Sequence, residues 1–126
     1  MDPIELVVPE GIVDSLPADS DETKLDMQRA VEGWEQDLNE ALAAADGDEA
    51  GAVVDFVTFF EERWEAYDGY VVELRAWGQS PIYAMAWRDL IASIVRQIHD
   101  HEDLGDRISR ERHARIFDDG IRPGQG

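Results

Sequence analysis

The residues best suited to bind a metal ion lie in the acidic stretch His99-Asp100-His101-Glu102-Asp103. His99 and Asp103 are four positions apart and would share one face of a helix, and imidazole and carboxylate groups can bind zinc or iron. The sequence contains no Glu-x-x-His, which di-iron bundles carry on two helices, and no His-Glu-x-x-His. We therefore interpret the stretch as a solvated helix end and predict no metal site, with His99, His101 and Asp103 as weak candidates.

Other patterns typical of catalysis are scarce. Glu61, Glu62 and Glu65 form a carboxylate cluster, and paired carboxylates can act as acid and base where their environments differ. Their neighbours are also acidic, so we interpret the cluster as solvated surface. There is no Gly-x-Ser-x-Gly, no phosphate-binding glycine loop and no Cys. We expect a protein that is not an enzyme and that needs no cofactor.

Basic residues are concentrated at the C-terminus. Residues 1–68 hold 20 acidic and 3 basic residues, whereas residues 106–126 hold 4 acidic and 5 basic ones. Arginine is enriched in protein interfaces because its planar guanidinium pairs well with carboxylates. We expect this C-terminal arm to contact the acidic body of a neighbouring subunit or partner through Arg107, Arg110, Arg112, Arg115, Phe117 and Arg122. The alternative is a small regulator that binds DNA or a protein through Arg107 to Arg115.

The elements that would position these side chains are helices. Apolar residues recur at intervals of three and four in three segments, predicting helices over about Glu22–Ala45, Glu49–Trp77 and Pro81–Asp103. The apolar stripes of these helices, which we expect to form the core, include Trp34 in the first, Trp64 in the second, and Tyr83 and Trp87 in the third. We expect Ser20 or Asp21 to cap the first helix and Ser80 to cap the third. We expect Gly78 to end the second helix and Gly105 to end the third. A short extended segment over Pro3–Pro9, a turn of helix up to Leu16 and a basic helix over Arg107–Phe117 complete the prediction.

Two features of the middle segment matter for function. Its apolar stripe keeps its phase across Asp68-Gly69, which favours one long helix over a hairpin turn at that dipeptide. Phe59, Tyr70 and Trp77 lie off this stripe. A helix that is apolar on a second face is often buried on a second side, which in a small protein can be another subunit. These three aromatic residues are therefore interface candidates.

Composition indicates the environment. The formal net charge is −18 for 126 residues, and Lys24 is the only lysine beside ten arginines. This resembles the habit of salt-in halophiles, in which molar salt screens such repulsion. We expect no transmembrane helix, since no apolar run approaches about 18 residues, and no signal peptide, since the first residues are acidic.

The sequence thus predicts an all-α fold, a three- to four-helix bundle over 21–105, with an extended N-terminal segment over 1–20 and the Arg-rich arm over 106–126. By shape alone this resembles the connector proteins that form rings in the neck of tailed viruses. We expect a structural or assembly protein of a halophile that docks through its termini, in the cytoplasm or in a virion assembled there. Its expected partners are proteins, in a homo-oligomer or a hetero-assembly, rather than membranes or nucleic acids.

Overall fold

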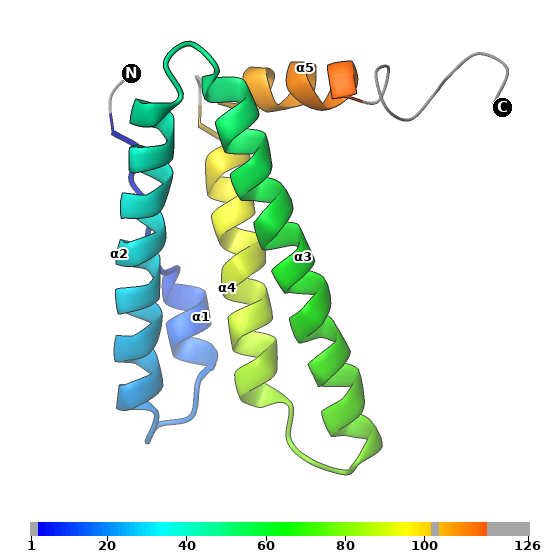
Figure 1. Ribbon diagram of the computed structural model, residues 1–126. Helices are drawn as coiled ribbons and strands as arrows, with labels where there is room; N and C mark the ends of the chain where they lie inside the picture. The colour runs from blue at the N-terminus through cyan, green and yellow to red at the C-terminus, as the bar shows by residue number, and fades with distance from the viewer. Residues whose placement is uncertain (1–2, 102–103, 116–126) are drawn as a thin grey trace, which may run out of the picture.

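Five helices make up the regular secondary structure of residues 3–101 and 104–115, the part of the chain that this computed structural model describes (Figure 1). No strand occurs in these residues, so the all-α prediction is confirmed. The helices are α1 (Glu10–Ser15), α2 (Asp21–Ala44), α3 (Glu49–Ala76), α4 (Ile82–His99) and α5 (Gly105–Arg115).

Helix α3 is the longest element, at 28 residues or about 42 Å. It passes through Asp68 and Gly69 without a break, so the long-helix interpretation is confirmed and the hairpin turn at that dipeptide is wrong. Asp48 accepts a hydrogen bond from the backbone N–H of Gly51 and caps the start of α3. The helix ends before Gly78, whose φ of +72° is a conformation that suits glycine.

The bundle is organised around α3. It packs most extensively against α4, and α2 and α5 each pack against it as well. Away from the loop that joins them, α2 and α3 diverge, while α3 and α4 run together to the opposite end of the molecule (Figure 1). The apolar stripes meet in one core that includes Met27, Leu38, Val53, Phe60, Leu90, Ile94 and Ile98.

The N-terminal segment is held between α2 and α4 by side-chain amides. Asn39 of α2 accepts a hydrogen bond from the N–H of Ile4 (2.8 Å) and donates one to its carbonyl oxygen (2.9 Å). Gln97 of α4 pairs with both backbone groups of Val7 in the same way, at 2.9 Å each. Each amide acts like a residue of a neighbouring strand, because it offers one donor and one acceptor. These hydrogen bonds hold the extended segment so that the side chains of Ile4 and Leu6 lie in the core.

The predicted helix ends need small corrections. Ser20 occupies the N-cap position of α2, but its hydroxyl donates to the carbonyl oxygen of Pro17 and makes no cap hydrogen bond. Helix α4 begins at Ile82 after Pro81, and no side chain caps it, so the predicted Ser80 cap is wrong. It ends at His99, and Gly105 begins α5 where we predicted a stop. No helix among the described residues is long and apolar enough to cross a membrane.

Candidate functional site

The histidine-rich end of α4 does not assemble into a metal site in the part of the chain that is described. His99 and His101 are both half-buried, and Asp103 lies outside the described residues. Among residues 3–101 and 104–115, no three His, Asp or Glu side chains lie close enough together to hold a metal ion. The carboxylates of Glu61, Glu62 and Glu65 are all exposed, as the solvated interpretation predicts.

The described part of the C-terminal arm docks on its own chain. Leu104 and Ile108 are fully buried in the core, which fixes the start of α5 against α3. Two of the predicted interface arginines then reach carboxylates of α3. Arg112 forms an ion pair with Glu61, and Arg107 Nη1 lies 4.0 Å from Glu49 Oε2.

The other arm candidates are less defined by the structure. Arg110 is exposed to solvent, whereas the side chain of Arg115 and the whole of Phe117 and Arg122 lie outside the described residues. A DNA-binding face made from Arg107 to Arg115 would have to release Arg107 and Arg112 from the acidic α3. The arm's contact with another subunit, and the regulator alternative, both stay predictions.

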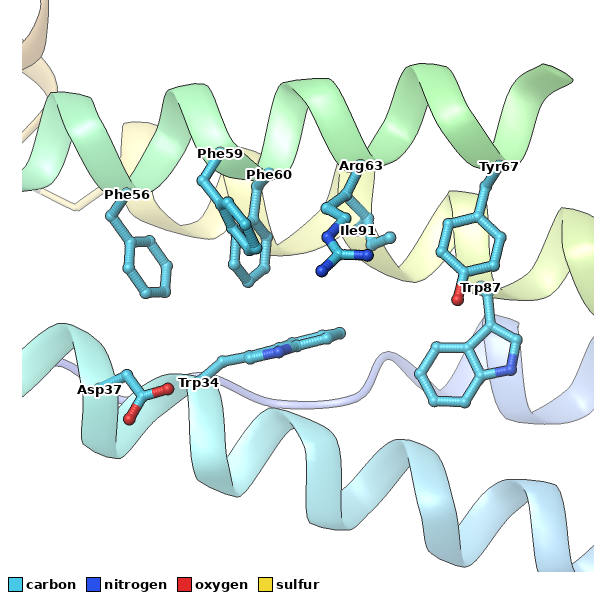
Figure 2. A pocket seen from close by; sticks show the side chains of 9 residues that line it. All are labelled: Trp34, Asp37, Phe56, Phe59, Phe60, Arg63, Tyr67, Trp87 and Ile91. Atoms are coloured by element: carbon cyan, nitrogen blue, oxygen red, sulfur yellow. The ribbon is translucent and has the colours of Figure 1, made fainter.

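A groove opens on the other side of α3, where α2 diverges from it. Figure 2 shows its two walls, with Trp34 and Asp37 on α2 facing the aromatic side chains of α3, and with α4 behind them. Its volume is about 530 Å³. The groove is lined by Trp34, Asp37, Phe56, Phe59, Phe60, Arg63, Tyr67, Trp87 and Ile91.

The aromatic rings of the groove hold one another in place. Phe60 is buried and stacks on Phe56 with a centroid distance of 4.7 Å, and it meets the edge of Trp34 at 4.9 Å. Phe59 is 48% exposed, and the guanidinium of Arg63 lies over its ring at 5.0 Å. This gives the groove a rigid apolar base with one charged group on each wall, Asp37 on α2 and Arg63 on α3.

The groove continues towards the loop between α3 and α4. Tyr67 and Trp87 line both the groove and a second hollow of about 430 Å³, whose other walls include Tyr70, Leu74, Trp77 and Tyr83. Of these, Trp77 is 80% exposed and Tyr70 55% exposed. All three off-stripe aromatic residues singled out from the sequence are therefore exposed, and all three lie on this surface.

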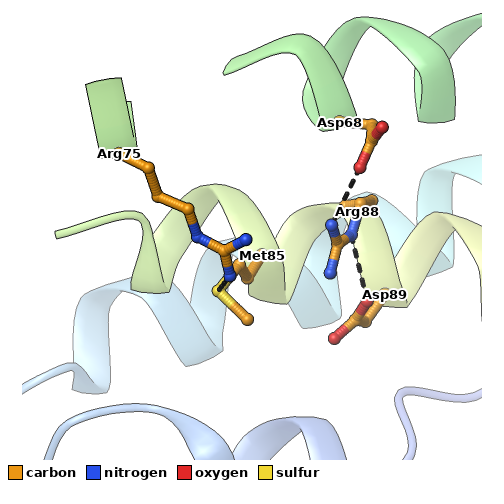
Figure 3. A network of polar contacts seen from close by, with 5 residues as sticks. All are labelled: Asp68, Arg75, Met85, Arg88 and Asp89. Carbon is orange, nitrogen blue, oxygen red and sulfur yellow. Dashed lines mark hydrogen bonds and ion pairs between the residues drawn. The ribbon is translucent and has the colours of Figure 1, made fainter. Parts of the chain in front are cut away.

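Polar contacts hold α4 against α3 beside this surface. Arg88 donates to Asp68 at 2.9 Å and also pairs with its neighbour Asp89 at 3.3 Å (Figure 3). The hydrogen bond to Asp68 raises the pKa of Arg88 above its ordinary value, while partial burial acts in the opposite direction. Arg75 donates to the sulfur of Met85 at 3.6 Å. These contacts orient two helices that carry the exposed aromatic residues.

From the sequence we identified Phe59, Tyr70 and Trp77 but missed the other aromatic residues of this surface. Trp34, Trp87 and Tyr83 fall on the core stripes, but Trp34 and Trp87 are only half-buried and Tyr83 is 42% exposed. Trp64, also on the stripe, is 36% exposed but lines a different hollow, with Ala92 and Val95. The available signal was that the three apolar stripes carry more large aromatic residues than a small core can enclose.

The chain belongs to a family of unknown function, DUF7971, whose family model matches residues 1–125. No curated protein matches the chain. No solved structure matches it either.

Proposed function

We propose that the protein is a non-enzymatic assembly subunit that binds a helix of another protein in the groove between α2 and α3. The observation that carries this proposal is the continuous set of partly exposed aromatic side chains from Trp34 to Trp77. Large exposed apolar patches mark interaction sites, and Trp, Tyr and Arg dominate interface energetics.

The shape of the groove suits a helix. Three helices surround it, and an apolar helix laid between α2 and α3 would complete a four-helix arrangement. The rings of Trp34, Phe59 and Tyr67 would then contact the apolar face of that helix. A helix with aliphatic or aromatic anchors at intervals of three and four is the expected occupant.

The charge of the walls adds a second property of the partner. Asp37 and Arg63 balance one another within the groove, but the surroundings are acidic: residues 1–68, which include α2 and most of α3, carry 20 acidic and 3 basic residues. A helix with basic residues along its edges would complement these surroundings, because an acidic helix would be repelled. The attraction weakens with added salt, so the apolar contacts must supply the affinity in concentrated salt.

We further propose that this assembly belongs to a halophile, as the net charge of −18 suggests. A connector ring of the kind found in virion necks is one assembly that would use such a subunit. Raising KCl from 0.1 to 3 M should raise the thermal unfolding midpoint, because salt screens repulsion within the folded chain. A midpoint that stays constant or falls would contradict the halophile proposal.

The groove can be tested with a photo-crosslinking phenylalanine analogue in place of Phe59, expressed in cells of the source organism. Illumination should give one discrete adduct, which mass spectrometry identifies as an amphipathic helical segment of another protein. The matched control carries the same analogue in place of Leu25, an exposed apolar residue of α2 outside the groove (46% exposed).

The crosslinking results either support or contradict the groove as the docking site. An adduct at position 59 that is absent at position 25, and that Trp34→Asp abolishes, would support the groove as the docking site. The absence of any adduct at position 59, or equal adducts at both positions, would overturn the proposal.

A further inference from the structure

The tip of the α3–α4 hairpin, residues 69–87, differs in charge from the rest of the chain. It contains one acidic residue, Glu73, and one basic residue, Arg75. With 32% charged residues in the chain as a whole, about six would be expected in 19 positions. Charge depletion together with aromatic enrichment is the compositional mark of an interface core.

Among the described residues, the tip also carries the most exposed aromatic side chain, Trp77, together with two others. Trp77, Tyr70 and Tyr83 are 80%, 55% and 42% exposed, and all three surround the hollow of about 430 Å³. In Figure 1 the tip lies at the end of the molecule opposite to the α2–α3 loop and α5. The tip is thus a neutral apolar surface away from the acidic residues near the start of α3, whereas the start of α2, with Asp21 and Glu22, lies at the same end of the molecule.

We propose that this tip pairs with the tip of a second copy of the chain around a two-fold axis. In such a pair the same patch meets itself, so it must be self-complementary in shape and charge. A projecting Trp77 beside a hollow gives the shape, because each copy can place its indole against the hollow of the other. A net charge of zero over residues 69–87 gives the electrostatic match.

Charge also favours a second copy over other partners. Two bodies of −18 each repel strongly wherever their acidic surfaces meet, and a neutral tip lets them touch with the least repulsion. A basic partner would gain more from the acidic surroundings of the groove than from the tip. A lipid surface is the other class that takes exposed Trp and Tyr, but anionic headgroups would repel the acidic body, and Arg75 is the only cation within the tip.

The pairing has a distinctive salt dependence. The apolar contact itself is strengthened or unchanged by salt, and the repulsion between the two bodies is screened as the Debye length falls to about 3 Å at 1 M. The dimer should therefore tighten from 0.2 to 3 M KCl. Added salt should instead weaken the binding of a basic partner to the groove, so the two interactions can be distinguished by their salt dependence alone.

The test is sedimentation velocity of the full chain at several concentrations in 0.2, 1 and 3 M KCl. We expect a monomer–dimer equilibrium between 14.2 kDa and twice that mass, with a Kd that falls as salt rises. Trp77→Ser should raise the Kd by about 30-fold or more, as removal of a central aromatic anchor does. Tyr70→Ser should act in the same direction.

Val72→Ser is the matched control. Val72 is 62% exposed on the same helix, but it lies about 200° around the helix axis from Tyr70 and does not line the hollow. It should leave the Kd unchanged, and circular dichroism of all three variants should match the parent chain.

Three outcomes would overturn the pairing. They are a monomer at every salt and concentration, a dimer that Trp77→Ser and Val72→Ser affect equally, and co-sedimentation of the chain with phosphatidylglycerol vesicles that Trp77→Ser abolishes. None of them bears on the groove, since the crosslink at position 59 tests that site independently.

Discussion

Between Glu49 and Phe60, α3 buries five residues, whereas between Glu61 and Ala76 it buries only Val71. The first half is covered by α2 on one side and by α5 on another, and α5 shares a core with Val54 and Val57. The second half packs on α4 and meets α5 at Glu61, which pairs with Arg112, and its aromatic residues Trp64 and Tyr70 are exposed.

The two ends of the molecule differ in how the chain closes on itself. At the closed end, defined by residues 3–7, the C-terminal half of α2, the first half of α3 and α5, segments distant in sequence clasp the bundle. At the tip, residues 69–87, Arg75 of α3 contacts Met85 of α4, and Ala86 and Trp87 join the core where the tip meets the rest of the bundle. Aromatic surface is left exposed at the tip while distant segments hold the closed end together, and the proposed pairing rests on this difference.

The largest expected effect on stability compares two adjacent residues of α3, the buried Phe60 and the half-exposed Phe59. Phe60→Ala should destabilise the fold by about 3–5 kcal/mol, because Phe60 is buried against Trp34 and Phe56. The adjacent Phe59→Ala should cost less than about 1 kcal/mol, since half of that ring is already in solvent. Urea unfolding in 2 M KCl measures both, and equal losses would contradict the assignment of Phe59 to the open surface.

The next largest effect is expected at the hydrogen bonds between Asn39 and the N-terminal segment. Asn39→Asp should cost about 1–3 kcal/mol, because a carboxylate cannot donate to the carbonyl oxygen of Ile4. Gln28→Glu is the matched control, since it adds the same charge at an exposed position of α2. Hydrogen exchange at the Ile4 amide should speed up only in Asn39→Asp. If both variants lose equal stability, added charge rather than the clasp is responsible.

Replacing a glycine by alanine should have opposite effects on stability at the two ends of the molecule. Gly105→Ala places a Cβ 2.4 Å from the carbonyl oxygen of His99 at the α4–α5 corner, and should destabilise by about 1–3 kcal/mol. Gly69→Ala in the exposed part of α3 meets nothing within 4 Å, and should stabilise by about 0.5–1 kcal/mol. Thermal unfolding of the pair checks both signs, and a destabilised Gly69→Ala would mean that α3 does not run straight through this position.

The smallest effect concerns the ion pair beside the tip. Asp68→Asn should cost about 0.2–1 kcal/mol in 0.1 M KCl and less in 3 M KCl, because half-exposed ion pairs contribute little and are screened by salt. Glu73→Gln removes a carboxylate of the same helix that forms no ion pair among the described residues. A difference between the two variants that persists in 3 M KCl would show that Arg88 positions α4 more firmly than its exposure suggests.

Much of the helical content could be predicted because it depends on local spacing. Met27, Val31 and Leu38 are buried as their intervals of three and four indicate. The same rule failed at Trp64 and Tyr83, which keep the helical phase but remain exposed. Periodicity identifies the face that can be buried, and it carries no information on whether the chain supplies an element to cover it.

The sequence by itself therefore predicted the helices, favoured one long α3 and placed Phe59, Tyr70 and Trp77 off its stripe. Only the tertiary structure decided that Asn39 and Gln97 hold the N-terminal segment, over separations of 35 and 90 residues, and that Arg107 and Arg112 turn back to α3. Helical phase is set by hydrogen bonds between residues four apart. The clasp and the groove depend on how far α2 diverges from α3, which no local interaction specifies.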